Sequence, residues 1–321
     1  MKYTTYKQIL SLAILMLINT TLQAQFVAKN GSLKVVGTQL TNAHNQPVVL
    51  AGVSFGWSCF HPRFYNKSAV KWLANNWKCT VVRASLGVEP ENGYLKDAAT
   101  SMQLITAVID AAIQQQIYVI VDWHSHNIQL QQAKIFFETI AKKYHQYPNI
   151  IYEIFNEPDY ETWPEVKAYS TEIIQSIRAI DANNIILVGS PRWDQDVHLP
   201  ASDPILGFTN IMYTMHFYAG THKQWLRDRT DEAMAKGLPI FISESAGMDA
   251  TGDGKIDEAE WEKYIDWIRK NKLSFITWSL SDKDESCSML LPSASSFGKW
   301  KAKDIKASGT LTKKYLQTFA F

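Results

Sequence analysis

The sequence contains little of several features, and each shortage argues against a class of protein. Only three of its 321 residues are Cys, which excludes a small scaffold held together by disulfides. The formal net charge is only +1, which gives no reason to expect nucleic acid or an acidic membrane surface as a partner. No stretch of the sequence approaches the eighteen apolar residues that a membrane span needs. Linkers rich in Pro, Ser or Thr are also missing, which favours a single domain.

The first 24 residues have the pattern of a secretory signal peptide. Lys2 and Lys7 precede an apolar run from Ile9 to Ile18, and a short polar stretch then ends at Ala24. This run is too short to cross a hydrocarbon core of about 30 Å, so we expect cleavage after Ala24 and no membrane anchor. The mature protein is therefore expected to be secreted or periplasmic, with residues 25–321 forming a single domain.

Apolar runs rich in β-forming residues alternate with amphipathic stretches along the chain. The predicted strands are nearly continuous apolar segments, as expected for a parallel sheet that is covered on both faces. Eight strands with intervening helices over about 235 residues have the size of a (β/α)8 barrel. An open doubly wound sheet would need a Gly-rich phosphate-binding turn after the first strand, and residues 52–56 do not supply one. The strands are predicted at 48–55, 80–86, 117–124, 150–156, 185–191, 210–218, 239–245 and 274–281.

Helices and a short hairpin complete the expected (β/α)8 TIM barrel. The hairpin is predicted to precede the barrel and to pair residues 33–36 with residues 48–50. Cys59 and Cys287 are expected in loops above neighbouring strands, so they either form a disulfide or remain free thiols; we prefer free thiols. The helices are predicted near 66–76, 100–116, 129–146, 163–180, 222–236, 257–271 and 310–319.

Polar side chains follow six of the eight predicted strands, at the end of a barrel where active sites lie. Burying such groups is costly unless they are paired, so packing alone does not explain them. In strand order they are Arg83; Asp122, Trp123 and His124; Asn156 and Glu157; His216 and Tyr218; Glu244; and Trp278, Asp282 and Lys283.

Glu157 and Glu244, at the ends of the fourth and seventh strands, suit glycoside hydrolysis. Two carboxyls about 5 Å apart allow one to attack the anomeric carbon while the other protonates the leaving oxygen. Arg83 and the Tyr218 hydroxyl are expected to hold one of the two carboxyls ionised. Asn156 is placed to hydrogen-bond a sugar hydroxyl next to the reacting carbon, and His124 and His216 are suited to the same ring.

The segment 154–158, Ile-Phe-Asn-Glu-Pro, resembles the Asn-Glu-Pro signature of glycoside hydrolase family 5. The similarity extends over most of residues 30–320, and segments 82–83, 122–124, 215–222 and 278–283 resemble the bacterial endoglucanase (cellulase) branch of that family. The resemblance implies a retaining mechanism without a cofactor, with Glu157 as acid/base and Glu244 as nucleophile. It also implies a −1 subsite lined by Arg83, His124, Asn156, His216 and Tyr218, a stacking platform at Trp278, and bonds from Lys283 and Glu285 to sugars on the non-reducing side.

The chain departs from the family pattern at the edges of the sugar subsites. Residues 245–247, Ser-Ala-Gly, stand where relatives usually carry an aromatic residue and then Gly, and residues 84–87 lack an aromatic that many relatives have. Trp57 and Trp193 lie at predicted loop positions and are candidates for further sugar platforms.

Two motifs raise the question of a metal ion. His124 and His126 form a His-x-His at a strand end, as in metal-dependent barrel hydrolases, but His216 is the one further ligand that the later strands offer. Residues 249–260 resemble an EF-hand calcium loop, although its third position is Thr and Asp257 also suits a helix cap. A structural calcium is therefore a hypothesis, with Asp249, Thr251, Asp253, Asp257 and Glu260 as candidate ligands.

These observations predict a monomeric endo-β-1,4-glucanase that hydrolyses a β-glucan polysaccharide or oligosaccharide. Mannan, xyloglucan and mixed-linkage glucan are alternatives within the same mechanism, because loops set the shape of the subsites. A carbohydrate-binding barrel without activity is a further alternative, but it predicts the loss of a catalytic carboxylate, and both carboxylates are present.

Overall fold

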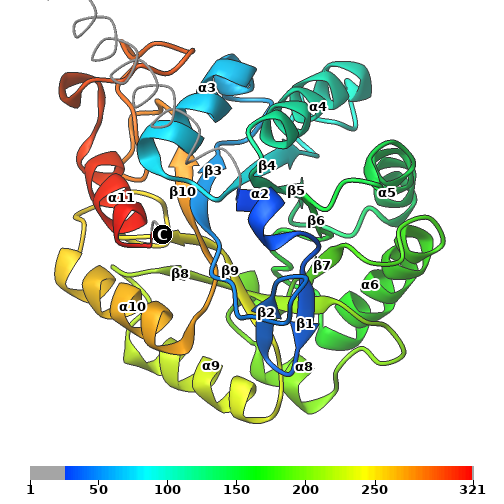
Figure 1. Cartoon of the computed structure of the whole chain (residues 1–321). Helices are drawn as coiled ribbons and strands as arrows, with labels where there is room; N and C mark the ends of the chain where they lie inside the picture. The colour runs from blue at the N-terminus through cyan, green and yellow to red at the C-terminus, as the bar shows by residue number, and fades with distance from the viewer. Residues whose placement is uncertain (1–25, 320–321) are drawn as a thin grey trace, which may run out of the picture.

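The structure, a computed structural model, describes residues 26–319. Eight parallel strands close into a barrel in the order β10-β3-β4-β5-β6-β7-β8-β9, and Figure 1 shows helices arranged as a ring around them. The predicted (β/α)8 barrel is thereby confirmed. The strands are β3 (Ala51–Phe55), β4 (Val81–Gly87), β5 (Tyr118–His124), β6 (Ile150–Glu153), β7 (Ile185–Val188), β8 (Ile211–Tyr218), β9 (Ile240–Ala246) and β10 (Phe275–Leu280).

The seven predicted helices are present, with ends that differ by a few residues, and the structure adds short helices at residues 26–30, 191–194 and 198–202 that the sequence does not predict. Side-chain caps fix three of the starts in residues 26–319: the side chains of Asn66, Asp97 and Asp257 accept hydrogen bonds from the amides of Ala69, Thr100 and Glu260. The helices are α2 (Phe26–Asn30), α3 (Lys67–Trp72), α4 (Ala98–Gln114), α5 (Leu130–Tyr144), α6 (Trp163–Arg178), α7 (Pro191–Asp194), α8 (His198–Ser202), α9 (Gln224–Ala235), α10 (Glu258–Asn271) and α11 (Ala307–Thr318), with short helical turns η1 (Pro62–Phe64), η2 (Leu73–Trp77) and η3 (Ala302–Asp304).

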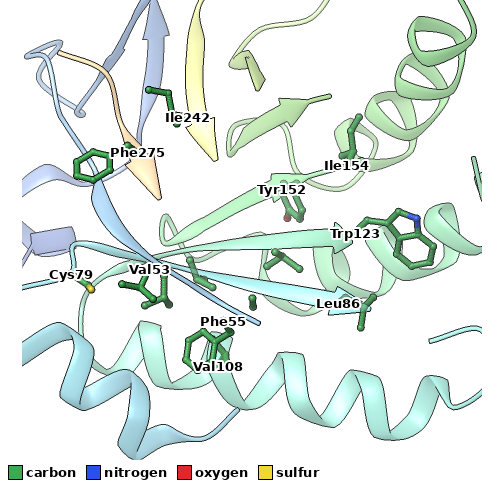
Figure 2. Close-up of a cluster of buried hydrophobic side chains, with 14 of the residues drawn as sticks. Val53, Phe55, Cys79, Leu86, Val108, Trp123, Tyr152, Ile154, Ile242 and Phe275 are labelled. Carbon is green, nitrogen blue, oxygen red and sulfur yellow. The ribbon is translucent and has the colours of Figure 1, made fainter. Parts of the chain in front are cut away.

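Two apolar layers hold the barrel together. The larger layer lies between the strands and the helices, and Figure 2 shows part of it, with Val53 and Phe55 of β3 near Val108 of α4. The smaller layer gathers side chains from the first residues of the strands, among them Ile120 and Leu187. Side chains two positions further along the same strands share the same face. The polar residues of the site therefore stand on top of this smaller layer.

A hairpin precedes the barrel, but the sequence predicts its second strand wrongly. Strand β1 (Lys34–Val36) pairs antiparallel with β2 (Gln39–Thr41), through a two-residue turn in which Gly37 has a φ of 60°. Residues 48 and 50 instead join the smaller apolar layer, so their apolar character reflects burial and not pairing in the hairpin. In Figure 1 this hairpin and α2 lie in front of the barrel.

Three sequence predictions concern the chain outside the barrel sheet. The predicted signal peptide, residues 1–24, lies outside the described residues. None of the described helices combines the length and apolar character that a membrane span requires. Cys59, Cys79 and Cys287 are free thiols, which confirms the preferred alternative for the Cys residues.

Candidate active site

The C-terminal ends of the strands surround a cleft of about 740 Å³. Of the residues predicted to bind or react with a sugar, Arg83, Asn156 and His216 do not line this cleft but are buried behind it. Trp193 is not among the residues that line it either; the Trp193 side chain is 40% exposed, and its ring centroid lies 6.4 Å from that of Tyr160. The predicted residues that do line the cleft are Trp57, His124, Glu157, Tyr218, Glu244, Trp278, Lys283 and Glu285.

The two predicted catalytic carboxyls face each other in this cleft. Oxygen atoms of Glu157 and Glu244, and a ring nitrogen of His216, lie within 4.8 Å of one another. Carboxyl groups about 5–5.5 Å apart are typical of retaining glycosidases, whereas inverting enzymes leave about 6.5–9.5 Å for a water molecule. The separation therefore suits direct attack on a sugar by one of the carboxylates.

Arg83 of β4 joins the acidic groups of three other strands. Its guanidinium is fully buried and donates to Glu153 at 2.6 Å, to Glu244 at 2.9 Å and to the Asn156 side-chain oxygen at 2.7 Å, and it lies 3.1 Å from Asp122. Burial opposes its charge, but these neighbouring carboxylates raise the pKa of Arg83 well above its usual range. Arg83 is thus a permanent cation that holds Glu244 in place and offsets the buried negative charges.

Glu244 is held from a second side by Tyr218. The Tyr218 hydroxyl donates to Glu244 Oε1 at 2.6 Å, opposite the oxygen that accepts from Arg83. The pairing of β8 and β9 shifts register before this point, so that His216 lies beside Glu244. This irregularity brings Glu244, His216 and Tyr218 to one end of the barrel.

His216 is the second buried cation of the site. Its Nδ1 lies 2.9 Å from Glu157 and its Nε2 lies 2.9 Å from the Ser243 hydroxyl, 3.2 Å from Asp194 and 3.8 Å from Glu153. Burial disfavours the charged ring, but these carboxylates outweigh burial and raise the pKa of His216 well above its usual value. Both ring nitrogens then carry protons, and Nδ1 donates to Glu157.

The surroundings shift the pKa values of the two central carboxyls in opposite directions. Burial and the charge of Glu157 raise the pKa of Glu244, against the opposing influence of His216, Arg83 and Tyr218. Burial of Glu157 is outweighed by the hydrogen bond and charge of His216, so its pKa is lowered. These directions by themselves favour Glu244 over Glu157 as the more readily protonated carboxyl. The hydrogen bonds favour the opposite assignment, because Glu244 receives two strong donors, whereas the single donor to Glu157 is a ring that can itself release a proton.

Aromatic rings form one wall of the cleft. The rings of Trp278 and His124 are stacked, with centroids 5.1 Å apart and planes 3° apart, and Trp57 meets His124 edge-on at 4.3 Å. His124 Nδ1 bonds Asp122 at 2.7 Å, while burial and the charge of Arg83 lower the pKa of His124 well below its usual value. A neutral His124 therefore holds the two indole rings in a fixed arrangement.

Lys283 and Glu285 form a charged pair at the rim of the cleft. Their side chains are 2.5 Å apart, and the Lys283 side chain is 65% exposed. The Cys287 thiol donates to Glu285, and burial raises the pKa of this thiol, so it is not a reactive thiolate. The pair offers a donor and an acceptor at a position where a sugar hydroxyl can reach both.

The sequence analysis missed two buried acids in the site. Glu153 ends β6 with its side chain fully buried against Arg83, and Asp194 lies fully buried in α7 beside His216. An acidic residue inside the apolar run of β6 was a usable signal for Glu153. The sequence near Asp194 contains no comparable signal, because Asp196 stands only two residues away in the same loop.

The structure does not support the predicted calcium loop. Glu260, the expected bidentate ligand, is paired with Arg227 at 2.6 Å and with Lys263 at 2.9 Å. Asp257 caps α10 and also pairs with Lys223 at 2.8 Å, while Asp253 accepts from Ser286. Within residues 26–319, the carboxylates of residues 249–260 do not converge on a common point as calcium ligands would.

The His-x-His motif does not form a metal site in the described residues either. His124 is bonded to Asp122, and His126 stacks against Trp57 at a centroid distance of 5.9 Å. Glu157, His216 and Glu244 do converge, but His216 uses its Nδ1 in a bond to Glu157. The donor set is therefore that of a hydrogen-bonded acid pair and not of free metal ligands.

Comparison with known proteins identifies the family. The family model described as "Cellulase (glycosyl hydrolase family 5)" matches residues 41–284. The chain belongs to glycosyl hydrolase family 5. Among curated relatives, an endoglucanase of Clostridium saccharobutylicum is 40% identical over 91% of this chain, and endoglucanase A of Evansella cellulosilytica is 41% identical over 85%. The chain spans 66% of the first relative and 57% of the second.

Solved structures match the chain over most of both lengths. A structure from Cytophaga hutchinsonii has a TM-score of 0.90 at 41% identity and covers 92% of this chain and 97% of its own. The catalytic domain of an endoglucanase from Thermobifida fusca has a TM-score of 0.86 at 32% identity, over 91% and 99% of the two chains. A variant of that domain was solved in complex with cellotetraose.

Proposed function

We propose that this protein is a retaining endo-β-1,4-glucanase that uses Glu157 as acid/base and Glu244 as nucleophile. The observation that carries the proposal is the short separation of these two carboxyls across a cleft, with oxygen atoms within 4.8 Å of each other. The endoglucanase names of the curated relatives support the same activity.

In the first step, Glu244 attacks the anomeric carbon of the sugar. A bond forms between a Glu244 oxygen and this carbon while the bond to the leaving oxygen breaks, and Glu157 gives its proton to that oxygen. Arg83 and Tyr218 keep Glu244 ionised and fix its orientation before the attack. The products of this step are a glycosyl-enzyme ester and a shortened chain with a free hydroxyl.

In the second step, water hydrolyses the ester. Glu157, now a carboxylate, takes a proton from the water as its oxygen attacks the anomeric carbon, and Glu244 leaves as a carboxylate. Two inversions at the same carbon restore the original β configuration. The hydrogen bond from His216 stabilises the Glu157 carboxylate between the two steps.

The remaining polar and aromatic groups are assigned to sugar binding. The side-chain nitrogen of Asn156 is buried and has no hydrogen-bond partner among residues 26–319, so it is available to donate to a hydroxyl beside the reacting carbon. Trp278 and Trp57 present ring surface to the cleft, on which the apolar face of a glucose unit stacks. Lys283 and Glu285 bind hydroxyls on the non-reducing side, and Trp193 with Tyr160 provides an exposed platform away from the cleft.

We further propose that the protein acts as a secreted or periplasmic monomer and needs no cofactor. The charged n-region and ten-residue apolar segment before Ala24 support export. The bond-making groups of both steps, Glu157 and Glu244, are side chains of this chain, which supports chemistry without a cofactor.

The test is reducing-sugar release by the mature protein on a panel of soluble polysaccharides. We expect activity on carboxymethyl cellulose that is lost in Glu244→Gln. Activity on mannan or xyloglucan alone would support the mechanism but contradict the proposed β-1,4-glucan substrate. No release from any glycan, by a protein whose thermal unfolding shows that it is folded, would contradict the enzyme proposal.

A further inference from the structure

Asp194 makes a buried contact with His216 for which the reaction described above has no use. One of its oxygens accepts from the Ser190 amide at 2.5 Å, and the other lies 3.2 Å from His216 Nε2. This second oxygen has no hydrogen-bond partner within residues 26–319, so its contact with His216 is one of charge. Burial raises the pKa of Asp194 well above its usual value, whereas the charge of His216, the Ser190 amide and the Thr214 hydroxyl favour its ionised form. Such a buried acid is costly to maintain and therefore points to a role.

The backbone around Asp194 is bent to place this side chain inside the protein. Arg192, Trp193 and Asp194 have φ values of 57°, 53° and 59°, all in the left-handed region. Such residues are uncommon outside Gly and cost free energy when they follow one another. The turn directs Asp194 inward while Trp193 stays 40% exposed. Strain of this kind is concentrated at functional sites.

We propose that Asp194 is a positioning residue that retains a proton on the hydrogen-bonded pair of His216 and Glu157. The inference rests on the proposed role of Glu157 as acid/base. His216 links the two acids, with Nδ1 at 2.9 Å from Glu157 and Nε2 at 3.2 Å from Asp194. The negative charge of Asp194 favours the doubly protonated ring, so the proton between Nδ1 and Glu157 stays in the site to higher pH.

The proton balance follows from this chain of contacts. In the first step the leaving oxygen takes a proton from Glu157, and in the second step Glu157 recovers one from water. Between the two steps the pair has given up this proton, so the ring is neutral and its Nδ1–H donates to the Glu157 carboxylate. Without the charge of Asp194, His216 and Glu157 together bind their proton less tightly, and the acid is lost at lower pH.

Several charged groups surround His216, and Asp194 is distinguished from them by its position. Glu153, Glu157 and Glu244 are bonded to other donors, and each takes part in the Arg83 network or in the reaction itself. Asp194 lies 3.2 Å from Nε2, the nitrogen opposite Glu157, and is closer to it than Glu153 at 3.8 Å; neither acid lines the cleft. The charged and titratable groups around the ring are Glu153, Glu157, Asp194, Glu244, His124 and His222.

The first test measures the charge of His216 without measuring activity. Nitrogen-15 NMR of His-labelled protein, with the His216 signals assigned by their loss in His216→Gln, should show a doubly protonated ring at pH 7. In Asp194→Asn the ring should titrate at a pH lower by roughly one unit or more. A neutral His216 ring in the unmodified protein, or an unchanged titration in Asp194→Asn, would overturn the proposal, whether or not the protein hydrolyses a glucan.

The second test is the pH dependence of kcat/KM on a cellooligosaccharide. The basic limb should move to lower pH by roughly one unit in Asp194→Asn, and Asp194→Glu, which keeps the charge, should restore it. With a dinitrophenyl cellobioside the shift should disappear, because this leaving group needs no proton. A uniform loss of rate on both substrates with no shift would assign Asp194 a structural role only.

Asp196→Asn is the matched control. Asp196 lies two residues away in the same loop, is nearly buried, and pairs with Arg229 at 2.5 Å instead of His216. We expect the basic limb and the His216 titration of Asp196→Asn to match those of the unmodified protein. If Asp196→Asn shifts both by as much as Asp194→Asn, the effect belongs to the loop in general and the proposal fails.

Discussion

The two ends of the barrel carry different kinds of side chain on the same strands: apolar at one end and charged at the other. On β5, Tyr118 and Ile120 belong to the smaller apolar layer, whereas Asp122 and His124, on the same face two and four residues after Ile120, belong to the site. On β4, Val81 belongs to the apolar layer and is followed on its face by Arg83. On these strands the first residues thus provide buried apolar side chains, and the last residues provide charged side chains.

The difference shows how a stable fold tolerates an unfavourable site. The apolar layer gains free energy from burial in proportion to its area. The C-terminal end of the barrel, here called the charged end, instead buries Arg83 and His216 with several carboxylates. Well-packed apolar groups would often match or exceed this arrangement in stability. The charged end is therefore explained by its chemistry, and its substitutions should affect rate and pH dependence more than those of the apolar end.

The largest expected effect is the loss of the nucleophile in Glu244→Ala. Turnover should fall by at least about 10⁴-fold on natural and activated substrates alike, because no carboxylate remains to form the ester. Azide supplied with an activated β-glycoside should restore product formation and give the α-glycosyl azide, since azide then attacks from the side that Glu244 occupied. Formation of the β-azide would contradict the assignment of Glu244.

The next effect is the loss of the acid/base in Glu157→Ala. Hydrolysis of natural glucan should fall by about 10²–10⁴-fold, while the first step on a dinitrophenyl glycoside should be largely spared. Azide should here give the β-glycosyl azide, because it attacks the ester from the side of Glu157. The anomeric configuration of the two azides, measured by proton NMR, thus distinguishes the two carboxyls. The same anomer from both variants would contradict the pair of roles.

The sequence contains enough information to predict the barrel and most of the site. Apolar runs such as 118–121 identify the buried strands because both faces of a parallel barrel strand are covered. The barrel geometry then places residues such as Arg83 and Glu244 at one end without any knowledge of side-chain contacts. Local pattern and topology, both of which the sequence carries, are sufficient for this placement.

The missed and wrong predictions depend on contacts between distant segments. Asp194 and Asp196 look alike in sequence, and only the left-handed turn directs Asp194 to His216 while Asp196 meets Arg229. The spacing of residues 249–260 matches a calcium loop, but Arg227, from a different helix, pairs with Glu260. Likewise, residues 48–50 are apolar enough for a hairpin strand, but residues 48 and 50 are buried in the smaller apolar layer.

A smaller effect, on stability alone, is expected at the apolar end of β5. Ile120→Ala should lower the free energy of unfolding by about 2–5 kcal/mol, because Ile120 is fully buried and its truncation leaves a cavity. Chemical denaturation measures this loss, and the pH profile of kcat/KM should stay unchanged in the folded protein. A shifted pH profile in Ile120→Ala would contradict the assignment of stability to the apolar end and of catalytic pH dependence to the charged end.

The smallest expected effect is on stability and concerns two acids of the charged end, Glu244 and Glu153. Burial and the charge of Glu157 raise the pKa of Glu244, so the folded protein binds this proton more tightly than the unfolded chain does. Folding stability therefore falls as the pH rises from the ordinary Glu range through the raised pKa, and the cost remains at neutral pH. Glu244→Gln removes this cost and should raise the free energy of unfolding at pH 7 by about 0.5–2 kcal/mol, with no gain below the ordinary Glu range.

Glu153→Gln is the control with the opposite sign. Burial of Glu153 is outweighed by Arg83 and His216, so its pKa is lowered and its ionised form stabilises the fold above the ordinary Glu range. Glu153→Gln should therefore destabilise the protein at pH 7, by a margin that shrinks as the pH falls through the lowered pKa. Thermal unfolding of both variants across pH tests this pair of signs. If both variants lose stability at pH 7, Glu244 is a stabilising partner of Arg83, and the charged end supports the fold more than its burial suggests.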